Sequence, residues 1–374
     1  MTRSEANDLI ERYHCALNGH NLTLLMPFYA EDAVVVSPMF RTLRGRDAIR
    51  QSFEDLFRLA PDYRVLPNDS LFEGDRAAEI STATATHSDH LFGLPPTGHH
   101  IEYQIVRLLT FRGAEIVYEQ RVYDLAAVLE RLEKARMDDE LRVAADIQTT
   151  LLPRPHHSGS FFSAVGASMA SRAIGGDFFE YCDLPTGAFG LALGDVSGKG
   201  PAAALVAAML QGMFSMETEQ AHTPPETLRR MNRALLRRRI EPRFATVMFG
   251  VLAPDRTFTY ANAGHLPSIL VRRGGAVQRL ASGGPLLGVF DNAEFPGETF
   301  ALEAGDTVVL FSDGVTEAWR TDEEFGDRRL IQVVRHNRAL EPGALLDTLF
   351  AAVREFSGAA VPTDDVTLAI LRVR

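Results

Sequence analysis

The feature that most constrains the fold of this chain is the stretch 174–200, IGGDFFEYCDLPTGAFGLALGDVSGKG, which reads as two short apolar strands around a turn. The turn triplet Pro-Thr-Gly at 185–187 supplies a fixed φ and a residue that tolerates positive φ. If the turn is centred on Thr186, Asp177 lies directly opposite Asp195. Facing carboxylates destabilise a hairpin unless a cation lies between them, and their oxygens suit Mg²⁺ or Mn²⁺. The stretch therefore predicts a hairpin built around a metal.

Further aspartates occupy similar positions later in the chain. Asp313 follows the apolar strand TVVLFS, and Asp364 and Asp365 precede the terminal strand VTLAILRV. A single aspartate at a strand end is commonplace, because aspartate favours turns. Several carboxylates that converge from rigid strand ends fit a binuclear metal site with room for a bridging water.

The pattern around these motifs predicts an antiparallel β-sandwich flanked by helices. Two helical stretches are expected, at 201–218 and 225–239, the first with proline in its first turn. The remaining apolar runs predict strands near 244–252, 257–262, 267–272, 276–280, 307–312 and 366–373.

Five motifs make a family resemblance specific. GGDFFE, GDVSGKG, YANAGHLP, LFSDGVTE and TDDVTL, in this order within 161–374, resemble the metal-dependent PPM (PP2C-like) serine/threonine phosphatases of the SpoIIE/RsbU branch. The resemblance implies two Mn²⁺ or Mg²⁺ ions. The ligands would be the carboxylates of Asp177, Asp195, Asp313 and Asp364 and the backbone carbonyl of Val196. Asp195 would bridge the ions, Asp177 and Asp195 would carry catalysis, and Asp365 would be a neighbour of the ligands.

The implied reaction is hydrolysis of phosphoserine or phosphothreonine on a partner protein by water activated between two ions, without a covalent intermediate. In this branch the substrate is commonly a phosphorylated anti-anti-sigma factor with a STAS fold. Lys199 could contact phosphate or be solvated, and Arg172 resembles a phosphate-binding arginine of some relatives. For His265 we favour a structural role in a turn over a catalytic role. Cys182 lacks the phosphate-cradling loop of a cysteine phosphatase.

The first third of the chain predicts a different domain. Apolar residues at helical spacing in 5–18 and 46–59 precede several strand-like runs, which together predict an α+β cone with a curved antiparallel sheet. With FYAEDAVVVSP and GRDAIRQSFEDLF in these places, residues 1–124 resemble the NTF2-like superfamily in its SnoaL-like branch. Such a cone could hold a ligand or a small isomerase or cyclase site. Its polar residues could line a pocket or lie on the surface: His87, His90, His99, His100, Tyr103, Glu119 and Arg121.

A long helix is expected between the two domains, at 125–153, because 124–152 contains no glycine or proline. Its 3-4 apolar spacing slips near Asp138, so the seam is not a perfect coiled coil. The helix either pairs with its copy in a dimer, which we favour, or lies against its own domains. Its ending ADIQTTLLP also resembles the linker that precedes phosphatase domains of this branch.

Bulk composition limits the possible partners and the cellular compartment. A net charge of −11 argues against nucleic acid as the main partner, and no apolar run reaches the roughly 20 residues that a membrane helix needs. Two cysteines and an N-terminus without a signal-peptide core favour the cytoplasm.

We therefore expect an α+β multidomain signalling phosphatase, with an N-terminal sensor or dimerisation domain (1–124), a linker (125–153) and a phosphatase domain (154–374). Two alternatives remain at this point. One is a catalytically inactive scaffold of the same fold that binds a sigma-factor regulator. The other places the main activity in the N-terminal cone, as a small-molecule isomerase or cyclase.

Overall fold

The computed structural model describes residues 3–220, 222–238, 244–358 and 362–374. The chain divides into two compact units, Met1–Glu140 and Leu141–Arg374, and the division falls inside helix α4 (Leu125–Leu151). Within the described ranges, no helix is both long and apolar enough to cross a membrane.

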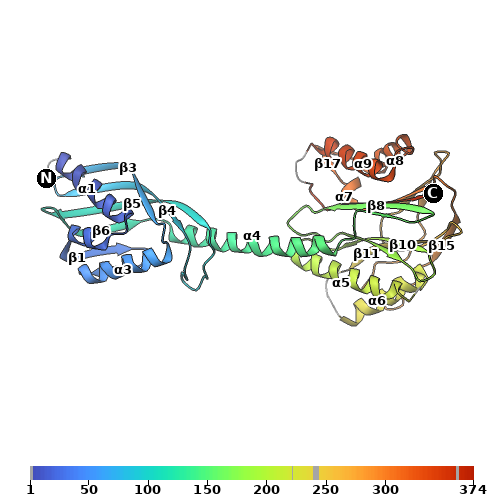
Figure 1. Cartoon of the computed structure of the whole chain (residues 1–374), viewed down its shortest axis with the longest axis horizontal. Coiled ribbons are helices and arrows are strands. Elements are labelled where there is room, and N and C mark those ends of the chain that lie inside the picture. The colour runs from blue at the N-terminus through green and yellow to red at the C-terminus, as the bar shows by residue number, and fades with distance from the viewer. Residues whose placement is uncertain (1–2, 221, 239–243, 359–361) are drawn as a thin grey trace. The chain divides into compact units, whose positions relative to one another are not determined.

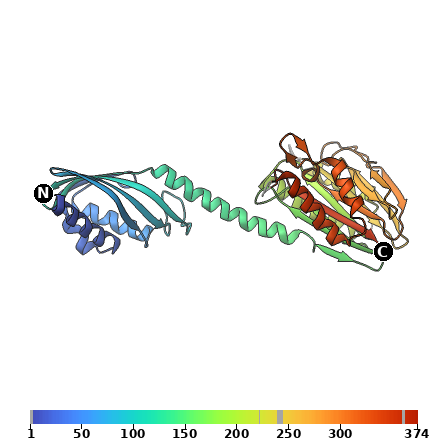
Figure 2. The ribbon, with the colours of Figure 1, turned by 90° about the horizontal axis from the view of Figure 1, so that it is seen from above.

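The N-terminal unit is one six-stranded sheet with its helices on one face (Figure 2). The strand order is β2-β1-β6-β5-β4-β3, and every pairing is antiparallel except that of β1 with β6. The expectation of a wholly antiparallel sheet is wrong at this pair, because β1 lies between its sequence neighbour β2, to which it is antiparallel, and the last strand β6, to which it is parallel. The elements are α1 (Arg3–Asn18), α2 (Leu22–Leu25), η1 (Met26–Phe28), β1 (Tyr29–Ser37), β2 (Arg41–Arg44), α3 (Arg46–Leu59), β3 (Arg64–Glu73), β4 (Arg76–Thr86), β5 (His100–Arg112) and β6 (Glu115–Val122).

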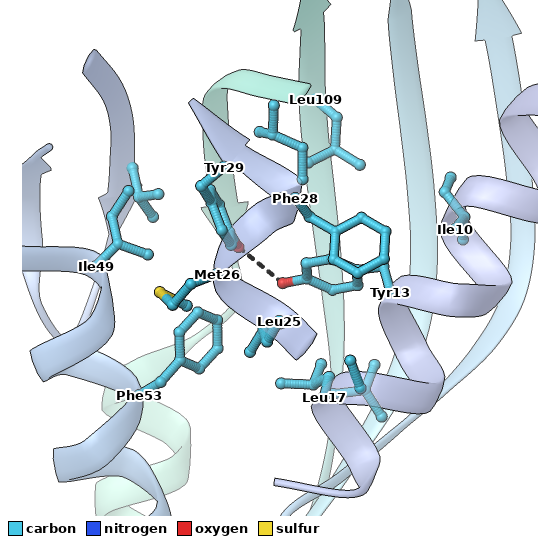
Figure 3. Packing of buried hydrophobic residues seen from close by; sticks show 14 of the residues in the cluster. Ile10, Tyr13, Leu17, Leu25, Met26, Phe28, Tyr29, Ile49, Phe53 and Leu109 are labelled. Atoms are coloured by element: carbon cyan, nitrogen blue, oxygen red, sulfur yellow. Dashed lines mark hydrogen bonds between the residues drawn. The ribbon is translucent and has the colours of Figure 1, made fainter. Parts of the chain in front are cut away.

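The expected apolar face of α1 forms the core of this unit together with α3 and the inner face of the sheet (Figure 3). Tyr13 and Leu17 of α1 are buried in the same apolar cluster as Phe53 of α3. The Tyr13 hydroxyl lies 2.8 Å from that of Tyr29, so each phenol finds a polar partner inside the core.

A buried network of charges crosses the same interior. Arg107 donates to Glu79 at 2.8 Å, and Arg121 donates to Glu119 at 2.9 Å. His14 Nε2 lies 2.8 Å from the Glu79 carboxylate. Burial works to raise the pKa of Glu79, but Arg107 and His14 outweigh it and lower that pKa to about 2. The cone therefore holds its internal charges as ion pairs.

The residues that could line a pocket in the cone lie in different environments. Glu119 and Arg121 belong to the buried network, whereas His90 and His100 are exposed. His99 Nε2 lies 2.7 Å from the carboxylate of Asp139 on α4.

The second unit is a sandwich of two sheets, ordered β15-β12-β11-β10-β9 and β14-β13-β16-β19-β8-β7. Helices α5 (Pro201–Thr218) and α6 (Pro224–Arg238) cover the first sheet, and α8 (Gly326–His336) and α9 (Pro342–Ser357) cover the second (Figure 1). The other elements are β7 (His156–Ser158), β8 (Phe162–Met169), β9 (Phe178–Asp183), β10 (Phe189–Val196), β11 (Ala245–Leu252), β12 (Thr257–Ala263), β13 (Ser268–Val271), β14 (Val277–Leu280), β15 (Gly297–Ala301), β16 (Thr307–Phe311), α7 (Asp313–Thr316), β17 (Trp319–Arg320), β18 (Glu323–Glu324) and β19 (Val366–Val373).

The expected flanked sandwich is confirmed, but three of its described helices, α7, α8 and α9, were not predicted. The two predicted helical stretches correspond to α5 and α6. Leu345, Leu349 and Val353 lie at helical spacing and are buried in α9, so the signal was present in the sequence. The predicted last residue of the second helix, Arg239, lies outside the described residues.

We expect Arg107→Met to lower the free energy of unfolding of the N-terminal unit by about 3 kcal/mol, the lower end of the range for breaking a buried ion pair, because His14 still faces Glu79. The measurement is urea unfolding of the full-length protein, followed by hydrogen exchange of β4 and β5. Arg112→Met is the matched control, since the Arg112–Asp32 pair is exposed and should contribute nothing measurable. Equal effects of the two variants would contradict this account.

Candidate metal centre

The hairpin predicted from the sequence is present with the predicted register. Phe178 pairs with Gly194, and the main-chain bond from Val196 N to Gly176 O, at 3.3 Å, continues the same register past Asp177. Asp177 therefore lies opposite Asp195. The turn also has the expected geometry, because Gly187 has a φ of 79°.

Asp177 is the most constrained carboxylate of the site. It is 5% exposed, and its Oδ2 atom is buried without a hydrogen-bond partner among the described residues. Burial, followed by the neighbouring charge of Asp195, raises the pKa of Asp177 well above its usual value. A buried carboxylate oxygen without a donor is costly unless a cation meets it.

Two more carboxylates, those of Asp313 and Asp364, lie near this pair. Asp195 is the second-last residue of β10. Asp313 begins α7 and is separated from the end of β16 by Ser312, and Asp364 lies two residues before β19. Burial and the charges of Asp313 and Asp364 raise the pKa of Asp195. Burial and Asp364 also raise the pKa of Asp313, whereas Lys199 works in the opposite direction. The four carboxylates are thus close enough to repel one another.

Among the described residues, no three His, Cys, Asp or Glu side chains already converge as a closed set of metal ligands. The donors nevertheless fit a hard divalent cation, because they are carboxylate oxygens of like charge. One of them, Asp177 Oδ2, is buried and has no partner in the part of the chain that the structure describes. The Val196 carbonyl lies beside them: a Cβ atom on Gly176 would be 2.8 Å from that oxygen and 3.5 Å from Asp195 Oδ1.

Asp365 has a different environment from the other aspartates. Its carboxylate accepts hydrogen bonds from Ser171 N at 2.7 Å, Ser171 Oγ at 2.9 Å and Gly176 N at 2.8 Å. Its main-chain oxygen accepts from Ser312 Oγ at 3.1 Å. Asp365 therefore ties the segment before Asp177 to the start of β19. Sequence reasoning missed Ser171 and Ser312, although Ser312 lies inside the motif LFSDGVTE.

The two basic residues singled out from the sequence lie in different surroundings. Lys199 Nζ is 2.9 Å from Asp364 Oδ2 and donates to Thr363 O at 3.0 Å. Lys199 is therefore held at the cluster of aspartates. Arg172 is exposed, next to the residue that binds Asp365.

His265 and Cys182 take no part in the cluster. The ring nitrogens of His265 lie 2.9 Å from Thr246 Oγ1 and 3.1 Å from Phe311 O, and burial lowers the pKa of His265 to about 4. This geometry agrees with the expected structural role. Burial raises the pKa of the Cys182 thiol to about 12, which opposes a nucleophilic role.

Residues 185–374 match the family model for stage II sporulation protein E (SpoIIE), and residues 7–132 match that for SnoaL-like polyketide cyclases. Phosphoserine phosphatase RsbU of Bacillus subtilis is 27% identical over 236 residues, which cover 62% of this chain and 70% of RsbU. Phosphoserine phosphatase RsbP of the same organism is 25% identical over 188 residues, or 48% of this chain and 45% of RsbP.

Solved structures agree with the fold of the second unit. The SiaA-PP2C domain of Pseudomonas aeruginosa aligns with a TM-score of 0.56 at 20% identity, over 64% of this chain and 98% of that domain. The RsbU and RsbW domains of Rv1364c from Mycobacterium tuberculosis align with a TM-score of 0.51 at 26% identity, over 57% of this chain and 60% of that one.

The SpoIIE match begins after Asp177, so this residue is placed at the site by the hairpin register and not by the match. The match nevertheless covers just over half of the chain and includes the three other clustered aspartates. The chain belongs to the SpoIIE family of PP2C-like phosphatases, and it carries an N-terminal SnoaL-like domain.

Proposed function

We propose that this chain is a metal-dependent phosphatase that hydrolyses phosphoserine or phosphothreonine on a partner protein. The observation that carries the proposal is the buried Asp177, which faces Asp195 across the hairpin and has a carboxylate oxygen without a partner among the described residues. The relatives RsbU and RsbP, both named as phosphoserine phosphatases, support the same reaction class.

Five groups would hold two Mn²⁺ or Mg²⁺ ions: the carboxylates of Asp177, Asp195, Asp313 and Asp364 and the Val196 carbonyl. Bound ions supply Lewis-acid activation of water and offset the charge of the phosphoryl oxygens. The protein contributes a rigid frame, because the aspartates lie at or beside strand ends and Asp365 fixes the segment before Asp177. Lys199, which is 39% exposed at its side chain, is placed to contact a phosphoryl oxygen beside Asp364.

The proposed substrate is a phosphorylated anti-anti-sigma factor with a STAS fold, as the SpoIIE/RsbU resemblance implies, and the proposed location is the cytoplasm. A homodimer through α4 is supported by a row of exposed apolar side chains four residues apart: Val143 is 61% exposed, Ile147 58% and Leu151 45%. Control by the N-terminal domain, through a ligand-dependent change that repacks α4, belongs to the same proposal.

We expect Asp195→Ala and Asp313→Ala each to reduce hydrolysis of a small aryl phosphate about a hundredfold or more, because each removes a ligand whose ion supplies several kcal/mol of transition-state stabilisation. The assay uses full-length protein with Mn²⁺, with Mg²⁺ and with chelator. Asp291→Ala, at an exposed aspartate, is the control and should keep wild-type activity. Activity that survives chelation and both substitutions would refute the binuclear site, and a catalytically inactive scaffold would show no activity in any of these assays.

We expect Asp177→Asn to remove metal binding without lowering the stability of the metal-free protein. Without metal, the variant should be at least as stable as the wild type at neutral pH, because it replaces a carboxyl group whose ionisation is opposed by burial and by Asp195. Added Mn²⁺ should raise the unfolding midpoint of the wild type and leave that of the variant almost unchanged. Differential scanning calorimetry with and without Mn²⁺ makes the comparison. A variant stabilised by Mn²⁺ as much as the wild type would remove Asp177 from the ligand set.

We expect the turnover of full-length protein to differ from that of residues 141–374 if the N-terminal unit controls the phosphatase. A fragment that begins at 141 keeps the end of α4, which contacts the second unit through the Gln211 to Leu151 O hydrogen bond, whereas a fragment from 154 loses it. The measurement is turnover and its Mn²⁺ dependence for both proteins. Equal values would argue against N-terminal control.

A further inference from the structure

A small apolar pocket lies beside the cluster of aspartates in the second unit, and we call it the α9 pocket. Its volume is about 50 Å³. Because a single water molecule needs about 10–15 Å³, the α9 pocket has room for a short aliphatic side chain. The described residues that line it come from β8, from the chain between β16 and β18, from α9 and from the segment before β19, and they include Met169, Gly314, Ala318, Trp319, Val353 and Thr363.

The α9 pocket shares a wall with the proposed metal centre. In the sequence, Gly314 directly follows Asp313. On the other side of the wall, Thr363 directly precedes Asp364. A Cβ atom on Gly314 would collide with the main-chain oxygen of Asp365 and would lie 3.3 Å from the carbonyl carbon of Asp364, so the two segments touch along this wall. The pocket therefore begins one residue away from two of the clustered carboxylates.

Trp319 lies at the rim of the α9 pocket and is 48% exposed. The backbone around it is held in place, because β17 pairs with β18 and Trp319 lies opposite Glu324. The next residue, Arg320, lies with its guanidinium carbon 4.6 Å from the ring centre of Phe356 in α9. Strand β17 and helix α9 thus lie side by side (Figure 1). An exposed tryptophan on a fixed backbone is typical of the residues that anchor a bound partner.

The rim of the α9 pocket also carries a positive charge. Arg354 of α9 lines the pocket, is exposed and forms no ion pair with any residue that the structure describes. The nearby Arg320 and Arg329 differ from it, because both are paired with Glu323. Since the chain as a whole has a net charge of −11, this positive rim is a local feature, and it is complementary to an acidic segment.

We infer that the α9 pocket binds an aliphatic side chain of the phosphorylated partner protein, close in sequence to its phosphoserine or phosphothreonine, with an acidic residue beside it at Arg354. This inference rests on the proposed phosphatase function. An extended segment advances about 3.3 Å per residue, so a phosphoryl group at the aspartates brings a side chain about one to three residues away to a pocket that begins beside Asp313 and Asp364. The pocket would therefore select the substrate by the sequence around the phosphorylated residue.

The first test uses phosphoserine peptides of alanine that carry one leucine, placed in turn at each of the three positions before and after the phosphoserine. We expect one position to raise the kcat/KM of full-length protein about tenfold over the all-alanine peptide, because partial burial of one leucine side chain supports a preference of this size. A glutamate next to that leucine should raise kcat/KM further, and Arg354→Gln should remove this second gain alone. Equal kcat/KM values for all positions would overturn the inference.

Two substitutions alter the α9 pocket and leave the aspartates in place. Ala318→Leu fills the pocket, and Trp319→Ala removes the exposed part of its wall. Each should reduce the leucine preference, which is the ratio of kcat/KM for the leucine and alanine peptides, from about tenfold to about one. Trp319→Ala carries the test if circular dichroism shows that Ala318→Leu does not fold. Met216→Ala is the matched control and should keep the preference, because Met216 is a 70% exposed apolar residue of α5 outside the pocket.

The fluorescence of Trp319 gives a measurement that does not depend on turnover, because Trp319 is the only tryptophan of the chain. The probes are the same peptides with a phosphonate in place of the phosphate ester, so that no hydrolysis occurs. With Mg²⁺ present, the leucine peptide should shift the emission of the full-length protein to shorter wavelength, since it removes the indole from water. The alanine peptide should shift it less, and Ala318→Leu should abolish the difference.

The outcomes separate this inference from the proposed function. A wild-type protein that hydrolyses the aryl phosphate but shows neither a leucine preference nor a difference in emission would overturn the inference alone. A wild-type protein that hydrolyses neither the aryl phosphate nor any peptide in the presence of Mn²⁺ would overturn both. A shift of the emission to shorter wavelength on raising the protein concentration alone would assign the α9 pocket to a second copy of the chain, and would also overturn the inference.

Discussion

The central constraint on the catalytic unit is that two carboxylates, those of Asp177 and Asp195, face each other across one hairpin. Both carboxylates are drawn out of water. The charge of Asp195 opposes the ionisation of Asp177, and the charges of Asp313 and Asp364 oppose that of Asp195. The surrounding sandwich holds them there because β10 is buried along almost its whole length between β9 and β11. The stability of the sheets thus maintains an arrangement that the two charges alone would oppose, and that a divalent cation would favour.

The two units treat buried charge in opposite ways. In the N-terminal unit, Glu79 and Glu119 each face an arginine inside the core, so the charges are balanced by the chain itself. In the catalytic unit, the aspartates raise one another's pKa values, and the one ion pair of the cluster that the structure shows, Lys199 with Asp364, lies at its partly exposed edge. Because perturbed carboxylate pKa values are typical of functional sites, this difference indicates that the catalytic site lies in the second unit.

The segment before Asp177 contacts several elements of the second unit. Its two glycines lie against the Asp365 carboxylate, the Val196 oxygen and the Gln148 amide at the end of α4. Side chains larger than hydrogen would not fit at these contacts. The Gly-Gly-Asp sequence is therefore a packing requirement as well as a family motif.

The sequence by itself determined the hairpin register, the sandwich class and the positions of the aspartates at strand ends, because turn chemistry and alternating apolar runs act over short distances along the chain. Local signals did not reveal the parallel pairing of β1 with β6, which joins residues far apart in the sequence. They also did not reveal the engaged carboxylate of Asp365, the pairing of Lys199 with Asp364, or the contact of Gln148 with Gly175. Only the tertiary structure decided these, because each depends on which strand ends and helix ends the folded chain brings within hydrogen-bond distance.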